Sequence, residues 1–69
     1  MTLEHIGLNV AEPQKGMDWW CANLGFTQTH PAFIVDSSGR MAIEFYRNDA
    51  APLFDFATTD PLTLHIAFT

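Results

Sequence analysis

The sequence predicts an α+β fold, in which one helix follows the first strand of a small sheet. Residues 3–10 alternate between apolar and small or polar side chains, which is the two-residue period of a strand. Apolar residues then recur at helical spacing across residues 13–24. Alternating patterns return in residues 26–47, where a compact turn separates two of them. The predicted order is therefore β-α-β-β-β, followed by a loop and one further strand.

The first predicted strand has two unlike faces. Its mainly apolar face carries Glu4, Ile6, Leu8 and Val10. Its small and polar face carries Leu3, His5, Gly7 and Asn9. Because successive strand residues point to opposite sides of a sheet, we expect the apolar face to pack on the helix. The face with His5 suits the wall of a cavity.

The predicted helix spans about residues 13–24. Pro13 suits the first helical turn, where its missing N–H costs nothing, and Gly25 suits a left-handed cap at the other end. One apolar stripe, expected to bury against the sheet, consists of Met17, Trp20, Cys21 and Leu24. Trp19 lies off this stripe, so we expect it to be partly exposed or to contact a second subunit.

Residues 26–47 predict three more strands. Residues 26–30 alternate weakly and are followed by Pro31, which favours an edge position or a break. Residues 32–36 and 40–47 form a predicted hairpin around a Ser-Ser-Gly turn. One face of its second strand carries Met41, Ile43 and Phe45, and the other carries Ala42, Glu44 and Tyr46.

The end of the chain repeats the beginning in chemical type. Residues 5–9 read His-Ile-Gly-Leu-Asn, and residues 65–69 read His-Ile-Ala-Phe-Thr. Residues 48–61 have no clear period and predict a loop, whereas residues 62–68 alternate again. We therefore expect one module at 1–47, a crossing loop at 48–61, and the first strand of a second module at 62–69.

Composition narrows the class of protein. Hydrophobic residues make up 48% of the chain, which is too many for a disordered segment. The net charge of −5 argues against a nucleic-acid binder. No apolar run approaches the length of about 20 residues that a membrane helix needs, and no signal peptide is visible. A single cysteine, Cys21, cannot form an internal disulfide, so we expect a cytoplasmic protein.

Three residues are candidate metal ligands. His5, Glu44 and His65 each lie on the less apolar face of a predicted strand. Imidazole nitrogens and carboxylate oxygens bind Zn, Ni, Fe, Mn and Co, and three such ligands leave positions open for substrate. The alternative is that each residue is structural, since a strand histidine is more often hydrogen-bonded and a strand glutamate more often solvated. His30 is expected at the surface, and Tyr46 in a wall or core.

Several segments together resemble the vicinal oxygen chelate superfamily, which includes glyoxalase I, bleomycin-resistance proteins and extradiol dioxygenases. The matching segments are residues 3–10, 19–26, 36–46 and 64–68. The resemblance implies βαβββ modules that pair into a curved, incomplete barrel around a metal, with this chain as half of it. It also implies that His5, Glu44 and His65 are three of four metal ligands. The fourth, a glutamate late in the second module that also moves the substrate proton, has no counterpart here, so the catalytic residue stays unknown.

The resemblance leaves more than one function open. Fosfomycin-resistance members do not use the position of Glu44, so its presence favours a glyoxalase-like, metal-dependent lyase or isomerase that chelates vicinal oxygens of a small substrate. Asn9 and Tyr46 would then lie in the substrate pocket. Bleomycin-resistance relatives instead bind ligands without a metal, so a metal-free binding or sequestering protein is the alternative. A truncated fragment without activity of its own is the third reading.

We also expect a homodimer. The apolar face of the last predicted strand would be uncovered in one chain, because its own helix and hairpin are missing. A symmetric dimer that exchanges this strand is a common solution. Such an exchange would place His65 of one chain beside His5 and Glu44 of the other.

Overall fold

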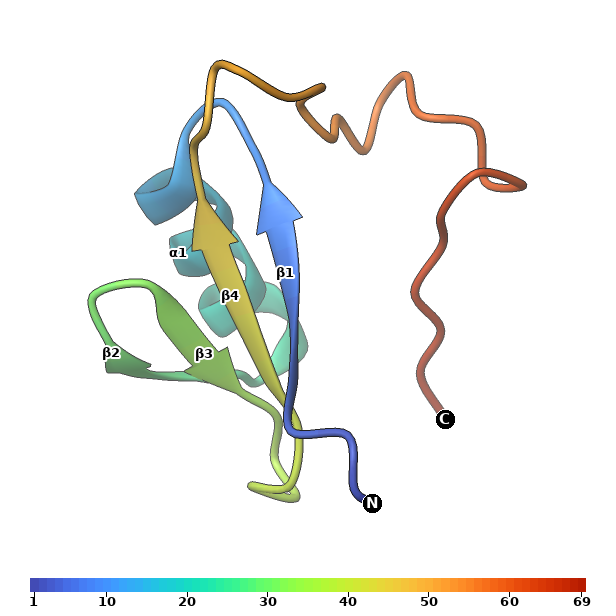
Figure 1. Ribbon diagram of the computed structural model, residues 1–69. Helices are drawn as coiled ribbons and strands as arrows, with labels where there is room; N and C mark the ends of the chain where they lie inside the picture. Colours follow the sequence, from blue (N-terminus) through green and yellow to red (C-terminus); the bar gives the residue numbers. More distant parts are fainter.

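The computed structural model describes all residues from 1 to 69, and it confirms an α+β fold with one helix and a four-stranded mixed sheet (Figure 1). The order is β-α-β-β-β, as the sequence predicts. The elements are β1 (His5–Asn9), α1 (Pro13–Leu24), β2 (Thr27–His30), β3 (Phe33–Val35) and β4 (Ala42–Tyr46).

The sheet has the strand order β1-β4-β3-β2. β1 and β4 are parallel, with His5 opposite Ala42 and Asn9 opposite Tyr46. β3 and β4 form the predicted antiparallel hairpin, and β2 continues the sheet on the far side of β3. The register of β2 shifts between Gln28 and His30, just before Pro31, so the proline lies at an irregular edge. Both inner strands therefore have a hydrogen-bonded neighbour on each side.

α1 begins and ends as the sequence predicts and covers one face of the sheet, lying behind it in Figure 1. Pro13 occupies the first turn, and Gly25 follows the helix in the left-handed conformation with φ 73°. Gly16 allows close contact with the sheet, because a Cβ there would lie 2.9 Å from Cε2 of Phe45. The packing thus depends on a small residue near the N-terminal end of the helix.

One hydrophobic core lies between α1 and the sheet. It consists of Leu8, Val10, Met17, Trp20, Phe26, Ile34, Ile43 and Phe45. Met17 and Trp20 are buried and Cys21 packs against the core, as predicted from the helical stripe. The prediction for Leu24 is wrong: its side chain is 41% exposed. Leu24 is the last helical residue, and it faces the C-terminal segment rather than the sheet.

Residues 62–68 do not form the predicted strand, which is a second correction. Residues 61–63 form a turn, and residues 64–69 have no regular structure; Figure 1 shows them as a coil. Their backbone–backbone hydrogen bonds are confined to the amides of Thr63 and Leu64, which donate to the Asp60 carbonyl. A strand needs a neighbouring strand to satisfy its backbone groups, and this segment has none beside it.

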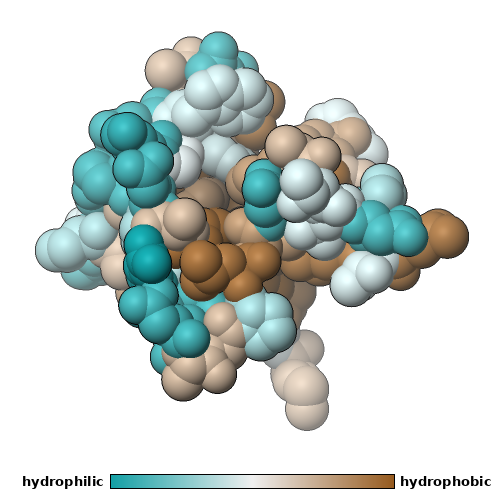
Figure 2. All heavy atoms as spheres, turned by 90° about the horizontal axis from the view of Figure 1, so that it is seen from above, coloured by the Kyte–Doolittle hydropathy of each residue, from teal (hydrophilic) through white to brown (hydrophobic).

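Large apolar side chains remain at the surface of the C-terminal segment. Leu62 is 93% exposed, and Phe56 and Phe68 are each more than half exposed. In the view from above, Figure 2 shows hydrophobic atoms at the surface in the middle and on the right of the molecule. The structure has no helix that is long and apolar enough to span a membrane.

Candidate functional site

The sheet face opposite α1 carries the candidate ligands His5 and Glu44. Alternation along the strands places His5 and Gly7 of β1 on this face together with Ala42 and Glu44 of β4. In the parallel register His5 lies opposite Ala42, and Gly7 lies opposite Glu44. His5 and Glu44 are therefore diagonal neighbours, and the other two residues of this quartet are small.

The imidazole of His5 is held from two directions. Its Nδ1 lies 2.6 Å from Oε2 of Glu4, and its ring meets the ring of Phe33 edge-on at 5.3 Å between centroids. The hydrogen bond to Glu4 raises the pKa of His5; burial opposes this shift, while the negative charges of Glu4 and Glu44 add to it. The hydrogen bond at Nδ1 leaves Nε2 available to a ligand.

Glu44 is half-buried and takes part in none of the ion pairs of the structure. Gly7 makes room for Tyr46: a Cβ at position 7 would lie only 2.9 Å from Cε1 of Tyr46, whereas Oε1 of Glu44 would be at an ordinary contact distance of 3.7 Å. The ring of Tyr46 therefore covers the backbone at Gly7, and its side chain is 39% exposed. Tyr46 thus lies on the open face of the sheet.

His65 does not join His5 and Glu44. Its Nδ1 lies 2.8 Å from the carbonyl oxygen of Pro61, and its side chain lines a cavity with Trp19 and Trp20 of α1. This cavity lies on the helix side of the sheet. No group of three or more His, Cys, Asp or Glu side chains is placed to hold a metal ion. The structure thus brings together two of the three residues predicted from the sequence.

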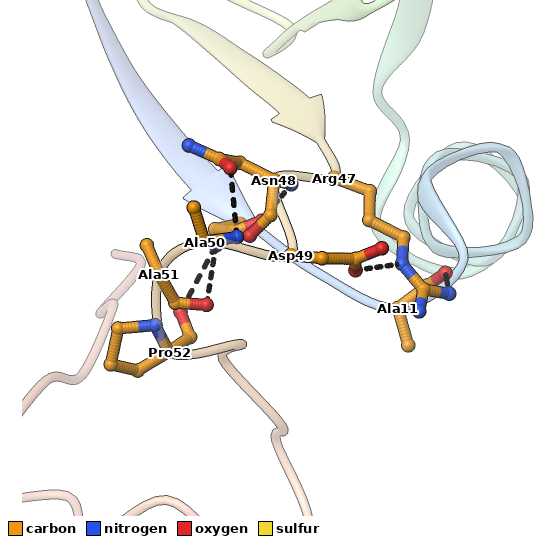
Figure 3. Close-up of polar contacts among 8 residues, drawn as sticks. Ala11, Arg47, Asn48, Asp49, Ala50, Ala51 and Pro52 are labelled. Carbon is orange, nitrogen blue, oxygen red and sulfur yellow. Dashed lines mark hydrogen bonds and ion pairs between the residues drawn. The ribbon is translucent and has the colours of Figure 1, made fainter.

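Asn9, a predicted pocket residue, holds the loop that follows β4; residues 48–52 of this loop are labelled in Figure 3. Its Nδ2 donates to the carbonyl oxygens of Asn48 at 3.0 Å, Ala51 at 3.4 Å and Pro52 at 3.1 Å. Its Oδ1 accepts from the backbone N–H of Asn48 at 2.7 Å. The sequence did not reveal this role, because a polar residue on a strand looks the same whether it binds a ligand or a loop.

The same loop is fastened by Arg47 (Figure 3). Its Nε lies 2.6 Å from Oδ1 of Asp49, and its Nη1 donates to the carbonyl oxygen of Ala11 at 3.1 Å. The backbone N–H of Phe54 also donates to the carbonyl oxygen of Asn9 at 2.6 Å. These bonds fix the chain where it leaves the sheet.

Comparison of the chain with family models, with characterised proteins and with solved structures found no match. The candidate site is therefore defined by the positions and chemistry of its own residues. These are an imidazole with a free Nε2 and an unpaired carboxylate, on neighbouring strands of an open sheet face.

Proposed function

We propose that this chain is a glyoxalase-like module of the vicinal oxygen chelate type, with metal-dependent lyase or isomerase activity on a small substrate. His5 and Glu44 supply two ligands of a divalent metal, and His65 of a second copy supplies the third. The observation that carries this proposal is the pairing of His5 and Glu44 on one open sheet face. The βαβββ order of the chain also agrees with the order that the resemblance implies for such modules.

The surroundings of His5 support a role as a ligand. Metal-binding histidines usually give their second ring nitrogen to a carboxylate or a carbonyl, which fixes the ring orientation. The hydrogen bond between Nδ1 of His5 and Glu4 has this form. Ligands on strands are also held more firmly than ligands on loops. When bound, a divalent metal would polarise the oxygens of the substrate as a Lewis acid.

A second copy is needed because His65 lies apart from the pair. The segment that carries it has no strand partner in its own chain and exposes Leu62, Leu64 and Phe68. Exchange of this segment in a homodimer would cover apolar surface and give its backbone a sheet edge. The edge of β1 that faces away from β4 pairs with no strand in its own chain, although the Asn9 carbonyl at its end already accepts the N–H of Phe54. In that arrangement, Tyr46 and Asn9 would lie near the bound substrate.

Metal analysis of the purified dimer tests this proposal. Protein exposed to Zn, Ni, Fe, Mn and Co should retain one of these ions at stoichiometric level. His5→Ala and Glu44→Gln should each lose it, because a lost ligand weakens the site. His30→Ala, which removes an exposed histidine from the same sheet, should retain it. A wild-type protein that retains none of the five ions would contradict the proposal.

A metal-free binding protein is the second candidate function. Two donors from one chain are too few for a firm metal site, while Phe33 and Tyr46 give the open face an aromatic border. Ligand binding that persists in the presence of a strong chelator would favour this alternative. For either function we propose the cytoplasm as the location, since Cys21 is a free thiol.

A further inference from the structure

A cavity of about 490 Å³ lies between α1 and the C-terminal segment. It is separate from the face that carries His5 and Glu44, because it is lined by the side of the helix and by residues 54–68. Its volume lies within the range of small-molecule sites, roughly 300–1,000 Å³. Both tryptophans of the chain, Trp19 and Trp20, contribute to its wall.

The wall of this cavity is mainly aromatic. The ring of Trp20 lies 5.7 Å from the ring of Phe56 and 5.7 Å from that of Phe68, and its interplanar angle with Phe68 is 66°. Aromatic rings prefer such tilted and edge-to-face contacts. A planar aromatic ligand would find partners of this kind at Trp19, which is 57% exposed, and at Phe68.

His65 supplies the polar contact. A carbonyl oxygen can only accept a hydrogen bond, so the contact with Pro61 at 2.8 Å places a proton on Nδ1 of His65. In the neutral imidazole, Nε2 is then an acceptor. No Lys, Arg, Asp or Glu side chain lines the cavity, and the chain has a net charge of −5. An anionic ligand would therefore find no cationic partner, whereas a neutral hydroxyl can donate to Nε2.

We propose that this cavity binds a neutral aromatic molecule that bears a hydroxyl group. The ring lies among Trp19, Trp20 and Phe68, and the hydroxyl donates to Nε2 of His65. His5 and Glu44 take no part in this site, but His65 and Phe68 do. The site therefore belongs to the chain whose C-terminal segment lies on its own helix, and the exchanged dimer of the proposed metal site would not contain it.

A titration followed by NMR of nitrogen-labelled protein tests this site. The probes are 4-propylphenol and 4-propylanisole, which differ in that the anisole has no hydroxyl donor. The indole N–H signals of Trp19 and Trp20 should shift saturably with the phenol. The anisole should bind about 2- to 10-fold more weakly, which is the effect of one net hydrogen bond.

Two variants locate the polar contact. His65→Ala should abolish the difference between phenol and anisole, and His65→Gln, which retains an acceptor, should restore part of it. His30→Ala should leave both affinities unchanged, since His30 lies outside the cavity. If His65→Ala detaches the whole segment and binding is lost, the comparison of the two probes in the wild-type protein still tests whether the hydroxyl group contributes to the affinity.

Three results would overturn the proposal. The first is the absence of a saturable indole shift up to the solubility limit of the phenol. The second is equal affinity of the wild-type protein for phenol and anisole. The third is an indole shift that follows protein concentration without added ligand, which would assign the cavity to a second copy of the chain.

Discussion

Residues 5–46 share a hydrogen-bonded sheet and one hydrophobic core. Residues 47–69 are attached to them mainly through side chains and one backbone hydrogen bond, from Phe54 to Asn9. The first region contains α1 and every strand pairing of the sheet. The second forms no strand, and its apolar residues Phe54 and Ile66 rest on the edge of the core. The contrast is clearest at the two similar sequences, because residues 5–9 form β1 while residues 65–69 are coil. An alternating sequence thus forms a strand only where a neighbouring strand can pair with it.

Asn9 and Trp20 make several of the contacts that join the two regions. Asn9 ties the loop after β4 through its amide. Trp20 is buried in the core, where its ring meets that of Phe45, and it also contacts Phe56 and Phe68 of the second region. Changes at these two positions should therefore separate the stability of the first region from the attachment of the second.

Trp20→Ala should have the strongest effect, because it removes a buried ring that serves both regions. A buried Trp→Ala change costs about 3–5 kcal/mol, and a chain of this size has about that much stability in total. We expect this variant to be unfolded in circular dichroism and urea titration. Trp19→Ala is the control: its ring is 57% exposed, so the loss should be about 1 kcal/mol or less. A Trp20→Ala protein that unfolds cooperatively at the wild-type urea midpoint would contradict the packing described.

Asn9→Ala should have an intermediate effect, centred on the second region. The change leaves the backbone N–H of Asn48 and three carbonyl groups without their side-chain partner. The free energy of unfolding should fall by about 1–3 kcal/mol, and hydrogen exchange at the amide of Phe54 should accelerate more than exchange in β4. Asn23→Ala removes an exposed bond to the Trp19 carbonyl and should change little. Equal effects of the two variants would refute the role assigned to Asn9.

The smallest predicted effect is on stability through the protonation of His5. Its pKa is raised above 6.5, mainly by the hydrogen bond to Glu4. Because the folded pKa exceeds the unfolded one, the associated stabilisation is present below pH 6.5 and is lost as the pH rises through the folded pKa. Proton NMR of the His5 ring should show the raised pKa, and Glu4→Gln should lower it. Identical titration curves with and without Glu4 would disprove the contact.

Local patterns predicted the first region well. The helix at 13–24, the cap at Gly25 and the hairpin around residues 36–39 each follow from chemistry within a few residues. Alternation also predicted that His5 and Glu44 lie on the less apolar faces of their strands. The parallel register of β1 and β4 then brings these faces to the same side of the sheet.

The predictions that failed concern residues whose positions depend on partners distant in sequence. Leu24 continues the helical stripe, but it is 41% exposed and lines the cavity beside the C-terminal segment. Residues 62–68 have the alternation of a strand but no neighbouring strand. His65 therefore lies beside the helix and not with His5 and Glu44. Asn9 could not be assigned to the loop from the sequence, since the carbonyl groups that it binds belong to residues about forty positions away.

A site shared between two chains makes a specific prediction for mixed variants. His5→Ala and His65→Ala proteins should each fail to retain a metal. Unfolding and refolding the two together should restore metal binding, because each mixed dimer contains a single intact site, with His5 and Glu44 of one chain and His65 of the other. Metal analysis of the refolded mixture should therefore recover part of the wild-type content. If the mixture binds no more metal than the two variants do separately, the shared site is refuted.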